Sequence, residues 1–348
     1  MERVLTVCAN ALCRELDVSI LTIYQKGRPF YFPLDKRIHC YDLGLGNAEN
    51  RKLLKQRLTE FMNEYHFNVV ISLGGIDMYY LHSINDGSKK IVWFHFAFNV
   101  AYTAWLGESP SVVSKLRGYL QHIKRIVHAR RYERVIAISK ADCQLWQRYT
   151  HKAIHINNPV TITPTHISNR TERRAISVGR LDYQKGFDYL IPVWRLVAQK
   201  HPEWHLNIYG EGILRDSIQK QIEDAKLTDS VTLCGRTTKL AEIYPLHSIY
   251  VMTSRTEALG LVLLEAASCG LPLIAFDCPS GPREIIKDGQ NGFLIDKVGD
   301  VYVMADKICQ LIEDEGLRML MGDKARAMTD YFNVDYIREQ WIDLLDKL

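Results

Sequence analysis

The residues best suited to chemistry lie in one stretch of the second half of the chain. Two glutamates, Glu257 and Glu265, flank Gly260, and apolar residues at helical spacing follow that glycine. The apolar, β-branched run at 249–252 predicts a buried strand just before them, so the stretch is predicted to form a strand, a loop and a helix. Because free backbone N–H groups at the start of a helix favour anions, we expect those of Leu259 to Val262 to face a phosphate group.

The two carboxylates are expected to contact different parts of one elongated ligand. Glu257 lies on the loop, whereas Glu265 is predicted about two turns into the helix, at roughly 1.5 Å per residue. Retaining glycosidases hold their two carboxyls about 5–5.5 Å apart, and two helical turns separate this pair by roughly twice that distance, so hydrolysis is disfavoured. The immediate neighbours of Glu265 are apolar, and a carboxylate in such surroundings needs a partner.

A second stretch offers two cations directly after a predicted strand. Arg180 and Lys185 stand five positions apart behind Gly179, where a planar fork and a point charge can converge on one anion. This spacing predicts a diphosphate site, although a basic pair after a strand is more commonly a solvated one. The sequence contains no Asp-x-Asp pair, so we expect these cations and backbone dipoles, rather than a metal ion, to stabilise negative charge.

One histidine and one glycine pair occupy similar positions after other predicted strands. His95 follows the strand 90–94, where the carboxyl end of a strand opens toward a ligand crevice. A histidine that is merely a satisfied core residue is the more common alternative. Gly210 and Gly212 also follow a strand, but Arg215 stands where a dinucleotide fingerprint has its third glycine.

Alternating strands and helices along the chain predict an α/β protein, and 348 residues are enough for two domains. A polar, proline-bearing stretch separates two such series, which predicts an N-terminal domain at 1–160 and a C-terminal domain at 161–333 with a cleft between them. The helix at 334–348 is expected to pack back on the first domain. The chain opens with helical spacing over 1–16, so we expect the strand and glycine-rich turn that normally precede the first helix to be absent, and the natural protein to begin earlier.

Composition and charge narrow the function classes. Hydrophobic residues make up 47% and charged residues 24%, which is typical of a soluble globular protein. The net charge of +4 is too small to indicate nucleic-acid binding. The eight cysteines are scattered without a Cys-x-x-Cys pair, so we interpret them as reduced residues of a cytoplasmic protein. No apolar run approaches the ~20 residues that a spanning helix needs, so any membrane contact is expected to be peripheral.

The segment 111–134 is the strongest candidate for such a contact. It has helical spacing with an apolar face and many interleaved cations, a pattern that suits an anionic membrane surface. An ordinary core-facing helix with a solvated basic face is an equal alternative. The apolar positions are Val112, Val113, Leu116, Leu120, Ile123, Ile126 and Val127, and the basic ones are Lys115, Arg117, Lys124, Arg125, Arg130, Arg131 and Arg134.

The order of motifs in the second domain resembles the retaining glycosyltransferases of family 4. The resemblance covers nearly all of that domain and is looser in the first, where His95 and Asn158-Pro159 carry it. It implies a GT-B fold of two facing Rossmann-like domains. The motifs are Arg180-x4-Lys185, Gly210-Glu-Gly212, Leu233-Cys-Gly235, Glu257-x7-Glu265, Ala267-Ser-Cys-Gly270-Leu-Pro272, Gly281-Pro-Arg-Glu284 and Asn291-Gly-Phe-Leu294.

The resemblance also implies roles for individual residues. By this likeness Arg180 and Lys185 bind the donor diphosphate, and Glu265 holds the ribose hydroxyls. Three further groups complete the expected site: Glu257 with the amides of Leu259, Gly260 and Leu261 orients the donor sugar and its phosphate, His95 lies near the reacting carbon, and Gly210, Glu211 and Gly235 lie where the base binds.

The expected function is therefore retaining, metal-independent transfer of a hexose or N-acetylhexosamine from a UDP-sugar to a lipid-linked or polysaccharide acceptor. We expect it in the cytoplasm or on the inner face of the cytoplasmic membrane, with no permanently bound cofactor. A nucleotide-sugar 2-epimerase of the same fold is one alternative, although no convincing acid–base set for C2 is evident. An inactive nucleotide-sugar-binding module is the other, because the first strand and glycine-rich loop are missing.

Overall fold

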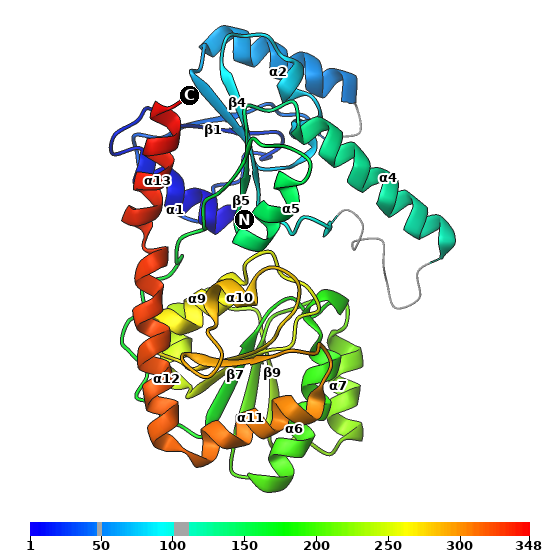
Figure 1. Cartoon of the computed structure of the whole chain (residues 1–348), viewed down its shortest axis with the longest axis vertical. Coiled ribbons are helices and arrows are strands. Elements are labelled where there is room, and N and C mark those ends of the chain that lie inside the picture. Colours follow the sequence, from blue (N-terminus) through cyan, green and yellow to red (C-terminus); the bar gives the residue numbers. More distant parts are fainter. Residues whose placement is uncertain (47–50, 101–110) are drawn as a thin grey trace. The chain divides into compact units, whose positions relative to one another are not determined.

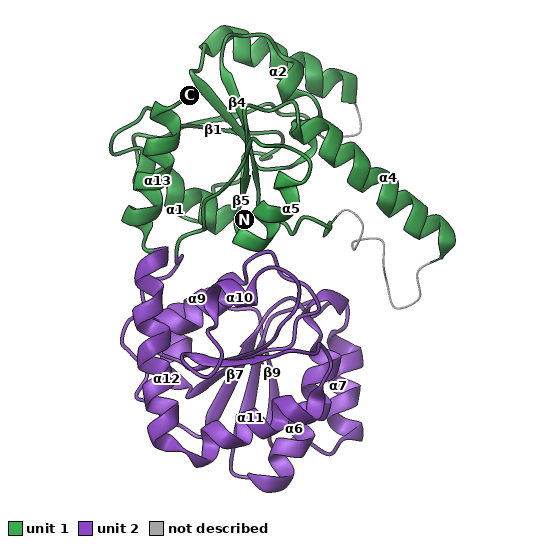
Figure 2. Ribbon diagram, in the orientation of Figure 1, with its two compact units in different colours: residues 1–159, 333–348 green, residues 160–332 purple. Residues whose placement is uncertain are grey.

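The computed structural model describes residues 1–46, 51–100 and 111–348, which form two compact units (Figures 1 and 2). Unit 1 comprises residues 1–159 and 333–348, and unit 2 comprises residues 160–332. The first boundary lies one residue before the position that the sequence predicts. The chain crosses twice between the units, and the N–H of Val160 donates to the carbonyl of Phe332 at 2.9 Å. The two crossing segments therefore lie side by side.

The described residues of unit 1 form two separate parallel sheets. Strands β3, β4, β5 and β6 form one sheet in that order, and β1 pairs with β2 in the other. The described helices and strands of unit 1 are α1 (Glu2–Leu12), β1 (Ser19–Thr22), β2 (His39–Asp42), α2 (Arg51–Tyr65), β3 (Val69–Ser72), β4 (Lys89–Phe94), α4 (Val112–Ala129), β5 (Arg134–Ala137), α5 (Lys140–Gln147), β6 (Ala153–His155) and α13 (Val334–Asp346).

The C-terminal helix α13 packs against α1 within unit 1 (Figure 1). Its Trp341 ring lies 4.9 Å from that of Trp93 on β4, and both side chains are buried. Arg338 of α13 also pairs with Glu15 at 3.2 Å. Burial of a large aromatic ring dominates such a contact, so the end of the chain is held to this unit mainly by Trp341.

Unit 2 is built on one six-stranded parallel sheet with the order β12-β11-β10-β7-β8-β9. Counted from the first strand of the unit, this is the doubly wound order 6-5-4-1-2-3. The elements of unit 2 are β7 (Arg174–Val178), α6 (Phe187–Lys200), β8 (His205–Tyr209), α7 (Arg215–Asp224), β9 (Val231–Gly235), α8 (Leu240–Ile243), β10 (Ile249–Met252), α9 (Leu261–Ser268), β11 (Leu273–Phe276), α10 (Pro282–Ile285), β12 (Gly292–Ile295), α11 (Val301–Glu313) and α12 (Glu315–Met328).

The order of strands creates a topological switch point between β7 and β10. These neighbours are paired, with Ile249 opposite Ala175 and Tyr250 opposite Ile176, yet the chain leaves them toward opposite edges of the sheet. Helix α6 packs against α11, and α9 packs against α12. In open α/β sheets ligands bind outside the carboxyl ends of the strands at such a point. The loops after β7 and β10 are therefore where a ligand is expected.

Helix α4 corrects two details of the sequence prediction. It ends at Ala129, and Arg134 belongs to strand β5 rather than to the basic helix. Arg125 is buried and donates to the carbonyls of Ala97 and Phe98, both at 3.1 Å, so it is not a surface cation. Hydrogen bonds to backbone carbonyls and stacking on aromatic rings offset the cost of burying the Arg125 charge. These partners are distant in the sequence, so the helical periodicity did not predict the burial.

Two other sequence expectations concern cysteines and membrane spans. The eight cysteines are all free thiols, of which Cys40 and Cys234 are exposed and six are buried. No helix in the part of the chain that the structure describes has the length and apolar character needed to cross a membrane.

Candidate functional site

The loops after β7 and β10 are hydrogen-bonded to each other. The N–H of Arg255 donates to the carbonyl of Gln184 at 2.8 Å, and the Gln184 side chain donates to the carbonyl of Thr256 at 2.9 Å. Gly186, with φ of 64°, packs so closely that a Cβ there would lie 2.1 Å from the carbonyl oxygen of Thr253. The short helix 183–185 and the loop before α9 therefore form one rigid surface at the switch point.

Lys185 and Glu257 meet on this surface. The Lys185 Nζ lies 2.5 Å from Glu257 Oε1, and the Ser254 hydroxyl donates to the same oxygen at 2.7 Å. The Glu257 side chain is 9% exposed and that of Lys185 is 16% exposed. At such burial a cation and a carboxylate attract each other far more strongly than at the surface. The structure thus brings together two of the predicted site residues, 72 positions apart in the sequence.

Arg180 lies at the edge of the same surface. Its guanidinium pairs with Asp182 at 3.1 Å, and its side chain is 72% exposed. In the structure Arg180 and Lys185 therefore contact different carboxylates, Asp182 and Glu257. An exposed pair contributes little to stability, so Arg180 can exchange Asp182 for another anion at small cost.

Helix α9 presents its N-terminus to this surface. Gly260 precedes it in the left-handed conformation, with φ of 84°, and the first helical residue is Leu261. Glu265 therefore lies little more than one turn from the N-terminus, not the two turns that the sequence predicts. Leu259 is buried, and a Cβ at Gly281 would come within 2.6 Å of the Leu259 carbonyl, so the turn is tightly packed.

Glu265 is buried and has partners of its own. The Thr161 hydroxyl donates to its Oε1 at 2.7 Å, and the Tyr244 phenol donates to its Oε2 at 3.4 Å. Burial raises the pKa of Tyr244 well above its usual value of 10, with the nearby Glu265 charge acting in the same direction. Tyr244 therefore stays protonated and remains a donor. Glu257 and Glu265 have separate sets of partners, as expected for carboxylates with separate tasks.

The glycines after β8 and β9 have a structural reason for being glycine. A Cβ at Gly210, whose φ is 150°, would lie 1.8 Å from the carbonyl oxygen of Gly179, and the Gly210 N–H donates to the Gly235 carbonyl at 2.9 Å. Glu211 is exposed and pairs with Arg215 at 3.1 Å. The packing of the segments that follow β7, β8 and β9 explains Gly210 without any ligand. Glu211 and Gly235 lie at the carboxyl ends of β8 and β9, as Lys185 does after β7.

His95 belongs to unit 1, whereas the other predicted site residues belong to unit 2. It directly follows β4, and its ring centroid lies 4.2 Å from that of Trp93. Both ring nitrogens are buried without a hydrogen-bond partner among the described residues. Burial, and then the positive chain terminus, lower the pKa of His95 to about 3, so its imidazole is neutral at pH 7. Unpaired buried ring nitrogens are unusual for a purely structural histidine.

Sequence reasoning missed Ser254 and Thr161, which donate to Glu257 and Glu265, and Arg255, which holds the loop that carries Glu257. Arg255 donates to both oxygens of Asp188, at 2.8 and 2.6 Å, and its guanidinium lies 4.0 and 4.1 Å from the ring centroids of Tyr183 and Tyr189. Arg255, like Ser254, precedes Glu257 on the same loop, and that position is a usable signal. Thr161 lies on the connecting segment, where no local pattern marks it.

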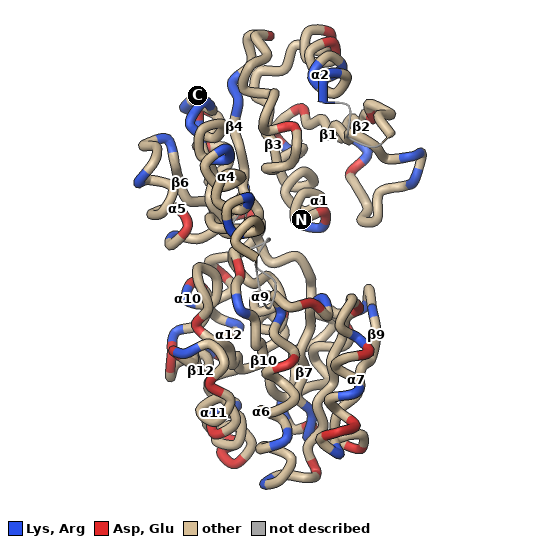
Figure 3. The backbone as a smooth tube through the Cα atoms, turned by 90° about the vertical axis from the view of Figure 1, so that its right-hand side faces the viewer, with Lys and Arg blue, Asp and Glu red and all other residues tan. Residues whose placement is uncertain are grey.

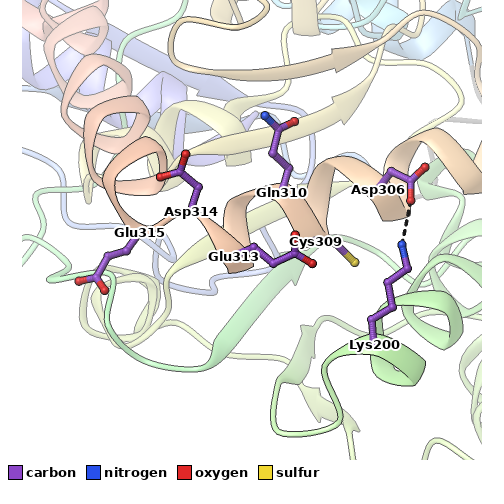
Figure 4. Close-up of a pocket in the computed structure, with 7 residues that line it drawn as sticks. All are labelled: Lys200, Asp306, Cys309, Gln310, Glu313, Asp314 and Glu315. Carbon is purple, nitrogen blue, oxygen red and sulfur yellow. Dashed lines mark hydrogen bonds and ion pairs between the residues drawn. The ribbon is translucent and has the colours of Figure 1, made fainter.

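A separate pocket of unit 2 lies away from these loops (Figure 4). Lys200 and Asp306, 3.2 Å apart, stand on one side of it, and Glu313 on the other. It lies at the C-terminal ends of α6 and α11, which run opposite to the strands, so it opens at the amino ends of the sheet. Ligands of such sheets bind at the carboxyl ends. No metal-binding group of three or more His, Cys, Asp or Glu occurs among the described residues.

Comparison with solved structures identifies the class of fold. The chain resembles TarM of S. aureus, solved in complex with UDP, with a TM-score of 0.72 and 26% identity over 84% of this chain and 59% of that one. HepE of Anabaena, solved with UDP and glucose, gives a TM-score of 0.82 over 100% of this chain and 96% of that one, and at 18% identity it supports the fold alone. The GT-B fold predicted from the sequence is thereby confirmed.

Sequence comparison identifies the family. The family model described as glycosyl transferases group 1 matches residues 161–328. A Haemophilus influenzae protein described as an uncharacterized glycosyltransferase is 31% identical, over 99% of this chain and 95% of the relative. The chain belongs to the glycosyltransferases. A poly(ribitol-phosphate) alpha-N-acetylglucosaminyltransferase of Staphylococcus aureus is 36% identical over 194 residues, which are 55% of this chain and 39% of that enzyme.

Proposed function

We propose that this glycosyltransferase moves a hexose or N-acetylhexosamine from a UDP-sugar to a polysaccharide or lipid-linked acceptor, with retention at the anomeric carbon and without a metal ion. The observation that carries the proposal is the buried contact of Lys185 with Glu257 at the switch point of unit 2, beside the N-terminus of α9. A sugar diphosphate can use all three groups: the cation and the amides at the start of the helix bind its phosphates, and the carboxylate accepts hydrogen bonds from its sugar hydroxyls.

The chemistry of the donor assigns a task to each group. Breaking the sugar–diphosphate bond leaves positive charge on the sugar ring and negative charge on the diphosphate. In this proposal Lys185, Arg180 and the amides of Leu259, Gly260 and Leu261 stabilise the leaving diphosphate. Glu257 then accepts hydrogen bonds from the donor sugar when Lys185 turns to the phosphate. Fixed donors of this kind require no reorganisation during the reaction, which is why they accelerate it.

Other predicted residues take the remaining parts of the donor and acceptor. We assign Glu265 to the ribose hydroxyls, and Gly210, Glu211 and Gly235 to the base. His95 is assigned to the reacting end of the substrates. Its neutral imidazole, whose nitrogens have no hydrogen-bond partner within the described part of the chain, can accept or donate one hydrogen bond there.

The relatives support a UDP-sugar as the donor and retention of configuration at the anomeric carbon. The printed name of the Staphylococcus aureus relative describes transfer of alpha-N-acetylglucosamine, and TarM was solved with UDP and alpha-GlcNAc-glycerol. An α-linked UDP-sugar that yields an α product must react with retention. The Erwinia amylovora relative, 32% identical over 62% of each chain, is named an amylovoran biosynthesis glycosyltransferase, which supports a polysaccharide or its lipid-linked precursor as acceptor.

The surface of α4 supports an acceptor at an anionic membrane. Apolar side chains that the sequence pattern placed on one face are largely exposed: Val112 is 81% exposed, Leu116 58% and Leu120 56%. Basic residues are distributed along the same helix (Figure 3). A core-facing helix would bury this face, so the exposed fractions favour peripheral contact with anionic lipid on the inner face of the cytoplasmic membrane.

A turnover assay tests the reaction. The purified chain is incubated with UDP-glucose and with UDP-N-acetylglucosamine, with and without a lipid-linked or polysaccharide acceptor and with EDTA, and UDP release is measured. Release that needs acceptor and persists in EDTA supports transfer, and proton NMR of an α-linked product supports retention. Tight UDP binding without turnover would favour a binding module, and a C2-epimeric sugar formed without acceptor would favour an epimerase.

Vesicle flotation tests the membrane contact independently. Vesicles of phosphatidylcholine alone and with one third phosphatidylglycerol are compared at low and high salt. We expect salt-sensitive flotation only with the anionic lipid, and its loss in a Leu116→Ser/Leu120→Ser variant. Tyr302→Ser, at a 70% exposed aromatic of α11 in unit 2, is the matched control and should float like wild type. Equal binding to both vesicles, or none, would contradict the assignment.

A further inference from the structure

Two hydroxyls donate hydrogen bonds of unequal length to the carboxylate of Glu265. The Thr161 Oγ1 lies 2.7 Å from Oε1, within the range of charge-assisted O–H···O⁻ bonds. The Tyr244 Oη lies 3.4 Å from Oε2, which is longer than an ordinary O–H···O bond. Of these two hydroxyls Thr161 therefore makes the stronger contact, although it stands 104 positions away in the sequence.

We propose that Thr161 is a positioning residue for recognition of the nucleotide ribose. Its hydroxyl fixes Oε1 of Glu265, so that the remaining lone pairs of the carboxylate are aimed at the 2′- and 3′-hydroxyls of the donor. The inference rests on the proposed function, because it assumes a ribose at Glu265. It adds a residue that lies outside every motif of the C-terminal domain.

The backbone and side-chain conformation around Thr161 is well suited to orienting the Glu265 carboxylate. The Val160 N–H, one residue earlier, donates to the Phe332 carbonyl at 2.9 Å, which fixes the backbone where the chain enters unit 2. A β-branched side chain has few χ1 rotamers, so the Thr161 hydroxyl is held in place by its own backbone. It has a single proton to donate, whereas a carboxylate offers about four lone-pair sites.

The alternative is that the Thr161 hydrogen bond only stabilises unit 2. A structural role of that kind would lower the stability of the unit or weaken binding of every nucleotide to a similar degree. A positioning role acts through the ribose hydroxyls alone. The two roles therefore differ in how the loss of the Thr161 hydroxyl depends on the presence of those hydroxyls in the ligand.

Isothermal titration calorimetry with two probes makes this distinction. UDP and 2′,3′-dideoxy-UDP are titrated into wild type, Thr161→Val and Thr161→Ser. Because one charge-assisted bond is removed, we expect Thr161→Val to weaken UDP binding about tenfold, with affinity for 2′,3′-dideoxy-UDP unchanged. Thr161→Ser keeps the hydroxyl and should restore most of the UDP affinity. Tyr244→Phe should weaken UDP binding only about twofold to threefold, because its bond is long.

Other outcomes would contradict the proposal or an assignment on which it rests. Unchanged or tighter UDP binding by Thr161→Val would mean that the hydroxyl competes with the ribose, and equal weakening for both probes would mean a structural role; either overturns the proposal. If Thr161→Val does not fold, Thr161→Ser and Tyr244→Phe still have to rank as stated. If wild type binds both probes equally, the assignment of Glu265 to the ribose is wrong. If wild type prefers ADP or GDP to UDP, only the assignment of UDP as the donor nucleotide is wrong. The matching dideoxynucleotides would then test Thr161.

Discussion

Each unit fastens a loop at the carboxyl end of a strand with one arginine stacked on two aromatic rings. In unit 1, Arg125 lies 4.1 Å from the ring centroid of Phe94 and 5.4 Å from that of Trp146, and its Nη1 donates to the carbonyls of Ala97 and Phe98 in the loop after His95. In unit 2, the Arg255 guanidinium stacks on two tyrosines in the same way and holds the loop that carries Glu257.

The difference between the two arginines is the partner of the charge. Arg255 donates to both oxygens of Asp188, and although burial lowers the pKa of Arg255, these bonds raise it above its ordinary value. Arg125 donates only to neutral carbonyls, and its Nη2 has no hydrogen-bond partner among the described residues. Burial lowers the pKa of Arg125 to about 10, with the charge of Asp142 acting against it. The donor loop of unit 2 is therefore the more firmly held of the two.

The largest expected effect is on the chemistry that the donor loops perform. Lys185→Ala removes the cation proposed for the diphosphate and should lower kcat/KM by about 10²–10³, equivalent to about 2.7–4 kcal/mol of transition-state stabilisation. Lys200→Ala is the matched control, because this lysine forms an exposed pair with Asp306 away from the site. Steady-state rates of UDP release measure both. Equal activity of the two variants would remove Lys185 from the mechanism.

Replacing each arginine by lysine tests the comparison itself. Lysine cannot form the planar fork, so Arg255→Lys should lower the free energy of unfolding of unit 2 by about 2 kcal/mol and weaken turnover as well. Arg125→Lys retains a donor for the two carbonyls and should cost unit 1 about 1 kcal/mol. Urea unfolding measures both changes. A larger loss for Arg125→Lys would show that the loop of unit 1 is the more firmly held.

His95 and His247 predict how each unit responds to acid. Burial lowers the pKa of His95 to about 3 and that of His247 to about 4, whereas unfolded histidine titrates near 6.5. The unfolded chain therefore binds more protons below pH 6.5. Each histidine should reduce the free energy of unfolding as pH falls, by up to about 1.4 kcal/mol per pH unit, until its own folded pKa is reached. Urea unfolding from pH 7 to pH 4 measures this. The free energy of unfolding should depend less steeply on pH than in wild type, for unit 1 in His95→Gln and for unit 2 in His247→Asn. A slope equal to that of wild type would contradict the lowered pKa of the histidine replaced.

The smallest effect is expected on the exposed face of α4. Leu116→Ser and Leu120→Ser should each change the free energy of unfolding by less than about 0.5 kcal/mol, because both side chains are more than half exposed. Ile126→Ser, at an 8% exposed position of the same helix, is the buried comparison and should cost about 2 kcal/mol or more. Similar losses at all three positions would mean that the face is packed, and the membrane proposal would lose its basis.

The sequence by itself determined the alternation of strands and helices, the fold class, and the loops on which Lys185, Glu257 and Glu265 lie. These follow from hydrophobic period and turn residues, which act over a few positions. The local pattern also predicted an apolar face on α4, but it could not say that this face is exposed or that Arg125 is buried.

Only the tertiary structure decided which loops meet. The order β12-β11-β10-β7-β8-β9 places β7 beside β10, and this alone brings Lys185 to Glu257 across 72 positions. The bond from Thr161 to Glu265 likewise joins residues that no periodicity relates. Period and turn chemistry specify the backbone within a segment, whereas neighbours in a sheet and the partners of a buried carboxylate are chosen when whole segments pack, because only then is the cost of leaving a polar group unpaired incurred.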